Sequence, residues 1–90
     1  MKINGEFVVR EIAGEYLLIP VGEVALDVHG MISVTESGRL LWDELKSGCT
    51  FAQLVETILG EYDVNQETAE TDVREFLEKL RKIGILTEED

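Results

Sequence analysis

The stretch that decides the fold reads MISVTESGRLLWDEL from Met31 to Leu45 and TFAQLVETILGEYDVNQETAETDVREFLEKLRKIGIL from Thr50 to Leu86. It opens with a short apolar run of the kind that forms a strand. Three segments follow in which apolar residues recur every three or four positions, which is the period of an amphipathic helix. The third segment is the longest, so we expect one strand followed by three helices, of which the last is the longest.

Capping residues mark the ends of the first two helices. Thr35 or Ser37 is expected to cap the first helix, and Gly48 to end it, because glycine readily adopts the left-handed backbone found after helices. Thr50 and Gln53 have the spacing of a capping box at the start of the second helix. The predicted apolar faces are Gly38, Leu41, Trp42 and Leu45 in the first helix, and Phe51, Leu54, Val55, Ile58, Leu59 and Tyr62 in the second.

The third helix is predicted to begin at Asn65 or Thr68 and to end at Gly84, after which Ile85 and Leu86 fold back on the core. Its acidic residues gather near its start and its basic residues near its end, which suits the helix dipole. Its apolar positions are Ala69, Val73, Phe76, Leu77, Leu80 and Ile83. Three favourable i,i+4 ion pairs are predicted along it: Glu70 with Arg74, Glu75 with Lys79, and Glu78 with Lys82.

Two runs rich in β-branched and aromatic residues precede this stretch, FVVREI at Phe7–Ile12 and EYLLIP at Glu15–Pro20. They flank the dipeptide Ala13-Gly14, so we expect a β-hairpin. Met31–Val34 then supplies a third strand, and the three strands form an antiparallel meander whose first and third strands are edges. An open edge beside a long helix is a layout suited to gripping an extended peptide.

The composition narrows the classes of function. Eight basic residues face 19 acidic ones, for a net charge of −11, which disfavours binding to nucleic acids and to anionic membranes. The acidity indicates either a basic partner or simple solubility. A single cysteine excludes an internal disulfide, and no apolar run approaches the roughly 20 residues that span a bilayer. We expect one cytoplasmic domain over residues 1–90, with frayed ends at 1–6 and 87–90.

Residues that could support catalysis are few. His29 is the only histidine, and Asp27 beside it does not complete a metal site, so we interpret His29 as a loop or edge-strand residue. A helix N-terminus next to Cys49 would lower the pKa of its thiol, but without a nearby partner we interpret it as an incidental free thiol. Trp42 is interpreted as a core residue. The sequence thus predicts no catalytic residue, no metal site and no cofactor.

Three parts of the chain together resemble the PqqD-like family. They are the run from Ile32 through the helix that contains Trp42, the segment TFAQLVETILGEYDV, and the ending DVREFLEKLRKIGIL. That family takes its name from a small protein of pyrroloquinoline quinone biosynthesis, and it includes recognition domains for ribosomally made, post-translationally modified peptides. The chain departs from the family where Val34 and Thr35 replace a frequent Leu-Asn, although threonine also caps a helix.

The resemblance implies an α+β, winged-helix-like fold in which a three-stranded antiparallel sheet precedes three helices. It implies a non-catalytic domain that binds the leader segment of a precursor peptide as an added strand on its third strand, in a groove beside the third helix. The domain then presents the peptide to a modifying enzyme, often a radical S-adenosylmethionine enzyme. The peptide-binding residues so implied are Met31, Ile32, Ser33, Val34, Asp72, Val73, Glu75, Phe76, Lys79, Leu80, Lys82 and Ile83.

We expect apolar pockets in this groove near Ile32, Val34, Val73, Phe76 and Leu80, although core packing is the alternative role for the last three. Lys79 and Lys82 are expected on its rim, facing acidic residues of the leader.

Two other functions fit the same pattern. Winged-helix folds also serve as DNA-binding regulators, against which the charge counts. The domain could instead be a structural subunit whose strand edge is docked on an enzyme. We expect a monomer or a weak dimer, because pairing of two third-strand edges would block the groove.

Overall fold

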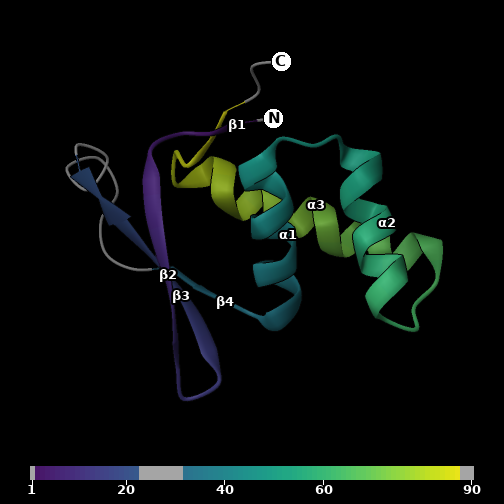
Figure 1. Cartoon of the computed structure of the whole chain (residues 1–90). Helices are drawn as coiled ribbons and strands as arrows, with labels where there is room; N and C mark the ends of the chain where they lie inside the picture. The colour runs from purple at the N-terminus through teal and green to yellow at the C-terminus, as the bar shows by residue number, and fades with distance from the viewer. Residues whose placement is uncertain (1, 23–31, 88–90) are drawn as a thin grey trace.

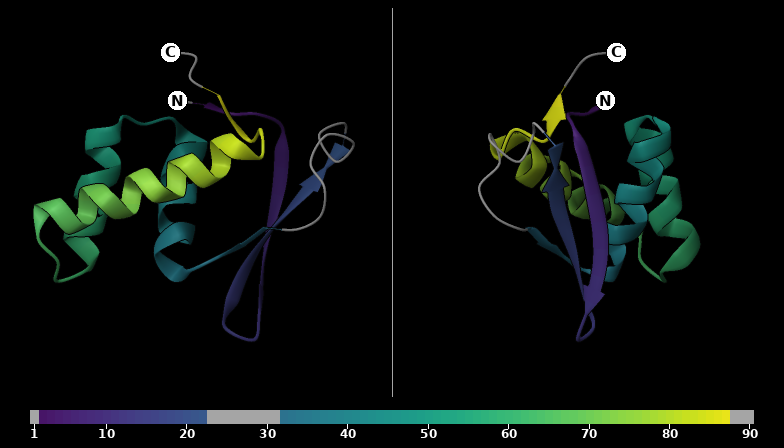
Figure 2. Two further views of the ribbon diagram at one scale, coloured as in Figure 1. Left: turned by 180° about the vertical axis from the view of Figure 1, so that it is seen from behind. Right: turned by 60° about the vertical axis from the view of Figure 1, so that its left-hand side comes forward.

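The computed structural model describes residues 2–22 and 32–87. Its elements are β1 (Lys2–Ile3), β2 (Glu6–Ile12), β3 (Glu15–Val21), β4 (Ile32–Val34), α1 (Glu36–Ser47), α2 (Phe51–Glu61), α3 (Gln66–Lys82) and β5 (Leu86–Thr87). The three helices lie to one side of the sheet formed by β2, β3 and β4 (Figures 1 and 2). This α+β arrangement confirms the predicted order of strands and helices and the winged-helix-like class. Met31, expected to open the third strand, lies outside the described residues.

The hairpin predicted at Ala13-Gly14 is confirmed. β2 and β3 pair antiparallel up to Ile12 and Glu15, so only Ala13 and Gly14 form the turn. Both have positive φ angles, 53° at Ala13 and 83° at Gly14, as a type I′ turn requires. Ala13 is strained, because a residue with a Cβ atom is disfavoured in the left-handed region.

The two-residue turn also determines which backbone groups face outward. The pair that closes such a turn, Ile12 and Glu15, is hydrogen-bonded, and bonded pairs recur at every second residue. Leu17 belongs to this set and directs its N–H and C=O toward β2. Ser33 lies opposite Leu17 in β4, so its own N–H and C=O point away from the sheet. β4 is an edge strand in the order β2-β3-β4, and within the described residues the outward N–H and C=O of Ser33 are therefore not used by the sheet.

Local capping defines the first two helices as the sequence predicts. The Thr35 hydroxyl accepts a hydrogen bond of 3.2 Å from the Gly38 amide, so Thr35 is the cap of α1 and Ser37 is not. At the start of α2 the Thr50 amide donates to Gln53 Oε1 at 2.8 Å, and the Gln53 amide donates to Thr50 Oγ1 at 3.2 Å. This reciprocal pair is the predicted capping box.

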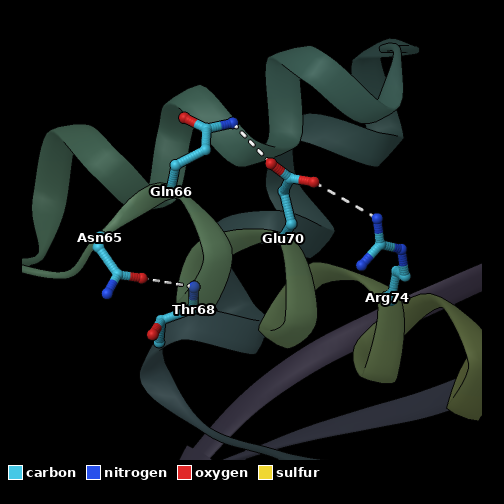
Figure 3. Close-up of polar contacts among 5 residues, drawn as sticks. All are labelled: Asn65, Gln66, Thr68, Glu70 and Arg74. Atoms are coloured by element: carbon cyan, nitrogen blue, oxygen red, sulfur yellow. Dashed lines mark hydrogen bonds and ion pairs between the residues drawn. The ribbon is translucent and has the colours of Figure 1, made fainter.

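The first turns of α3 are held by side chains of the helix itself (Figure 3). Asn65 Oδ1 accepts a 2.7 Å bond from the Thr68 amide, which makes Asn65 the cap. Glu70 accepts a bond from Gln66 Nε2 at 3.0 Å and pairs with Arg74 at 3.3 Å. The predicted Glu70–Arg74 pair is thus confirmed.

The other two predicted ion pairs of α3 are wrong, since neither appears among the described residues. Glu78 pairs with Arg81 at 3.6 Å rather than with Lys82, and Lys79 bonds to a backbone carbonyl rather than to Glu75. An exposed i,i+4 pair contributes only about 0.2–0.5 kcal/mol, so a competing partner of similar strength is enough to replace it.

A Schellman motif ends α3 and returns the chain to the N-terminus. The Gly84 amide donates to the Arg81 carbonyl and the Ile85 amide to the Leu80 carbonyl, with φ of 82° at Gly84. β5 then pairs antiparallel with β1, so Lys2–Ile3 lies beside Leu86–Thr87 (Figure 1). The expectation of frayed ends stays a prediction.

One hydrophobic core joins the sheet to all three helices. Trp42 is its largest fully buried side chain and packs edge-to-face on Phe7, with ring centroids 5.3 Å apart. This confirms the interpretation of Trp42 as a core residue. The buried apolar set is Leu18, Ile32, Val34, Leu41, Trp42, Leu45, Leu54, Val55, Ile58, Ala69, Val73, Leu77, Leu80, Ile85 and Leu86.

Candidate functional site: the β4 edge beside α3

A depression of about 340 Å³ lies where the β4 edge meets α3. Small-molecule pockets span roughly 300–1,000 Å³, so this depression is large enough to receive side chains of a bound segment. It is lined by Gly14, Glu15, Ser33, Val34, Thr35, Glu36, Phe76 and Lys79. The strand edge and the helix therefore meet at a hollow, as the resemblance implies.

Four of the residues predicted to bind peptide line this depression: Ser33, Val34, Phe76 and Lys79. Ser33 and Lys79 are exposed and Phe76 is half-buried. Asp72, Glu75, Lys82 and Ile83 are also exposed on α3 but do not line it. Ile83 leaves 39% of its surface accessible at the end of the helix, which extends the apolar surface beyond Phe76.

The predicted pockets around Ile32, Val73 and Leu80 do not appear among the described residues. Val73 and Leu80 have no exposed surface and Ile32 only 8%, so their side chains belong to the core beneath the groove. Val34 is 6% exposed but still borders the depression. Phe76 is the apolar residue of the predicted set that both lines the depression and remains partly accessible.

Lys79 makes a contact that the sequence did not predict. Its Nζ donates to the carbonyl oxygen of Ser33 at 2.8 Å. Because this carbonyl faces away from β3, the ammonium sits on the outer side of the sheet edge. The expected partner, Glu75, lies one turn away on the same helix. The bond from Lys79 to Ser33 instead links the two walls of the groove, α3 and β4.

Sequence reasoning missed the end wall of the depression. Gly14 and Glu15 come from the hairpin turn, and Thr35 and Glu36 from the start of α1. In the β3–β4 register Tyr16 lies opposite Val34, at the end of β4. The hairpin turn therefore extends beyond β4 and lies beside the start of α1. Only the β3–β4 register reveals this, and no local motif encodes it.

A second and larger hollow lies elsewhere. It measures about 600 Å³ and is bounded by Phe7 of β2, by Trp42 of α1 and by the end of that helix at Gly48. We take the β4 edge as the candidate site because backbone groups that the sheet does not pair lie there beside a long helix. The larger hollow is lined by none of the residues predicted to bind peptide.

Catalytic chemistry finds little support in the described residues. Burial, with the nearby Glu44 carboxylate, raises the pKa of the Cys49 thiol, so the expected effect of a helix N-terminus does not prevail. Within residues 2–22 and 32–87, no group of three or more potential ligands is placed to hold a metal ion. Asp27 and His29 lie outside the described residues.

None of the helices described has both the length and the apolar character that crossing a bilayer requires.

These observations define a small α+β domain of winged-helix-like architecture in which an open sheet edge lies beside the last helix. Residues 22–86, most of the chain, match the family described as Coenzyme PQQ synthesis protein D (PqqD). The chain belongs to this family, which confirms the resemblance seen in its sequence.

Two solved structures share the fold. One is described as TbiB1 in complex with the TbiA(beta) leader peptide; it is 27% identical, with a TM-score of 0.77, and the match covers 100% of this chain and 99% of that one. The other is a lasso peptide synthetase B1 complexed with the leader peptide, 19% identical, with a TM-score of 0.72 and 93% of each chain covered. No match to a curated protein was found.

Proposed function

We propose that this domain binds the leader segment of a ribosomally made precursor peptide by adding it as a strand to β4, in the depression beside α3. The observation that carries the proposal is Ser33, whose backbone N–H and C=O face outward next to a hollow walled by Phe76 and Lys79. The similarity to TbiB1, which was solved with a leader peptide, supports the same ligand class.

Energetics indicate what the peptide must supply. The two outward groups of Ser33 form hydrogen bonds worth about 0.5–1.5 kcal/mol each, whereas association costs about 4–15 kcal/mol in lost freedom. Backbone pairing alone is therefore too weak. An apolar side chain contributes about 1.5–3 kcal/mol when buried, and Phe76 with Ile83 offers the surface for it. Because side chains alternate along a strand, the leader is expected to carry apolar anchors at alternate positions.

Charges on the rim add to this recognition. We place Lys79 and Lys82 opposite acidic residues of the leader, with Asp72 and Glu75 beside them on the exposed side of α3. Replacing both lysines with glutamate is expected to weaken binding and to flatten its salt dependence, because rim charges act mainly through screened attraction. Unchanged affinity in the double variant would show that Lys79 and Lys82 do not attract acidic residues of the leader.

The domain's role is recognition rather than catalysis. We propose that it hands the bound peptide to a modifying enzyme, of the radical S-adenosylmethionine class that the family resemblance implies. A DNA-binding role is not favoured: the net charge is −11, and Arg74 and Arg81 of α3 are paired with Glu70 and Glu78.

A random peptide library displayed on mRNA and selected on the immobilised protein tests the function without assuming any leader sequence. Selected peptides are then titrated into isotope-labelled protein, with a DNA duplex as the control ligand. We expect saturable NMR shifts at Ser33 and along Asp72–Ile83. A library that yields no binder, or shifts with the duplex alone, would refute peptide recognition.

Strand addition has its own test in two variants of Ser33. Ser33→Pro removes the outward N–H but no hydrogen bond of the sheet, since proline is tolerated on an edge strand whose N–H faces solvent. Ser33→Ala keeps that N–H and is the matched control. We expect the proline variant, and not the alanine variant, to lose up to about tenfold in affinity, the value of one hydrogen bond, with thermal unfolding as the check on folding. Equal affinities would mean that the peptide binds without pairing to β4.

A further inference from the structure

Lys79 occupies the acceptor that an added strand needs. Its Nζ lies 2.8 Å from the Ser33 carbonyl oxygen, 46 positions away in sequence, and the bond is exposed to solvent. The same side chain has Glu75 available one turn earlier, yet it bonds to a neutral backbone oxygen. One of the two outward groups of Ser33 is thus already occupied in the free protein.

Resting on the proposed function, we propose that Lys79 is a displaceable guard of the β4 edge. An unprotected edge strand pairs readily with another chain, and a lysine at the edge discourages such pairing. While its ammonium holds the Ser33 carbonyl, a second copy of this protein cannot pair there without breaking the bond. A peptide strand must also break the bond between Lys79 and the Ser33 carbonyl. The peptide recovers the lost binding free energy if one of its carboxylates pairs with the displaced Lys79 ammonium.

This guard restricts where the peptide carries its acidic residue. Among the described residues that line the depression, Lys79 is the single cation, whereas Glu15 and Glu36 place carboxylates at its other end. A peptide carboxylate near those residues meets like charge, which is unfavourable. Within the depression, selection for an acidic side chain is therefore confined to the peptide position beside Ser33, whereas Lys82 can contact a leader carboxylate only outside the depression.

The first test needs no ligand. Lys79→Met removes the charge and the donor but keeps a long aliphatic chain, and Lys79→Arg keeps both. Lys46→Met on the exposed surface of α1 is the matched control, with the same change of net charge and hydrophobicity. In sedimentation velocity over a concentration series, we expect Lys79→Met to dimerise about tenfold more tightly than the other proteins, because each dimer loses two guards. A Lys79→Met protein as monomeric as Lys46→Met would overturn the guard.

The second test uses peptides selected on the wild-type protein, each synthesised with its acidic residue and with the amide analogue. We expect Lys79→Met to lose most of the preference for the acidic form and to bind the amide form about threefold more tightly than wild type does. The same preference in both proteins would overturn the selective role of Lys79 while leaving peptide binding intact. Failure of wild type to select any peptide would refute the proposed function, and the sedimentation result would still decide whether Lys79 guards the edge.

Discussion

Replacing Gly38 with alanine tests how tightly α1 is pressed against the base of the groove. A Cβ built at this buried position would lie 3.0 Å from the Val34 Cβ and 3.2 Å from Cε1 of the Phe76 ring. Both distances are shorter than ordinary carbon contacts of about 3.5–4.0 Å. The methyl group therefore forces either β4 or the Phe76 ring to move.

Two opposing contributions set the size of the effect. Alanine in place of glycine inside a helix gains up to about 1 kcal/mol, whereas overpacking a filled core costs about 1–3 kcal/mol. The net change expected for Gly38→Ala is a loss of about 0–3 kcal/mol. Gly60→Ala is the matched control, because Gly60 is also helical but a methyl group added there would meet no atom within 4 Å, and this variant should gain up to about 1 kcal/mol.

Urea denaturation of both variants measures the difference directly. Since the helix-propensity gain is common to both, subtracting one from the other isolates the steric contribution, expected at about 1–3 kcal/mol. For a domain of this size each kcal/mol shifts the melting temperature by roughly 4–8 °C, so thermal scans give a second reading. If Gly38→Ala were as stable as Gly60→Ala, the close approach of α1 to Val34 and Phe76 would be refuted.

Three further predictions concern local structure. Ala13→Asn should stabilise the protein by about 0.5–1 kcal/mol in urea denaturation, because asparagine tolerates the positive φ of 53° at this position; no gain would mean that the turn is not of type I′. Thr50→Ala should lose about 1 kcal/mol through the capping box with Gln53, whereas Ala52→Ser on the exposed first turn should change stability little; equal losses would contradict the cap. Burial raises the pKa of the Cys49 thiol, so alkylation by iodoacetamide should reach half its maximal rate at a higher pH in the folded protein than in urea-unfolded protein. The contribution of this thiol to the free energy of unfolding should be complete at low pH and be lost as pH rises through the folded-state pKa. Identical pH profiles for folded and unfolded protein would contradict a partly buried thiol.

Elements whose signals are local could be predicted from the amino-acid sequence. Thr35, the Thr50–Gln53 pair and Asn65 cap their helices through bonds to residues three positions away, so the pattern that predicts them is complete within one turn of chain. Gly84 and the buried Ile85 follow the same logic at the end of α3. Apolar periodicity likewise predicted most of the core faces, because the side that a helix buries repeats with its own period; the exceptions on α3 are Ile83, which is exposed, and Phe76, which is half-buried.

Which residues meet across the groove depends on how the strands and helices pack. The β3–β4 register turns the backbone of Ser33 outward, and packing of α3 beside that edge brings Lys79 to it in place of Glu75. The same packing leaves Phe76 accessible and hides Val73 and Leu80, although all three share a helical pattern. Pairing of β1 with β5 joins the two ends of the chain. Each of these contacts depends on segments far apart in sequence, whose relative position no local pattern encodes.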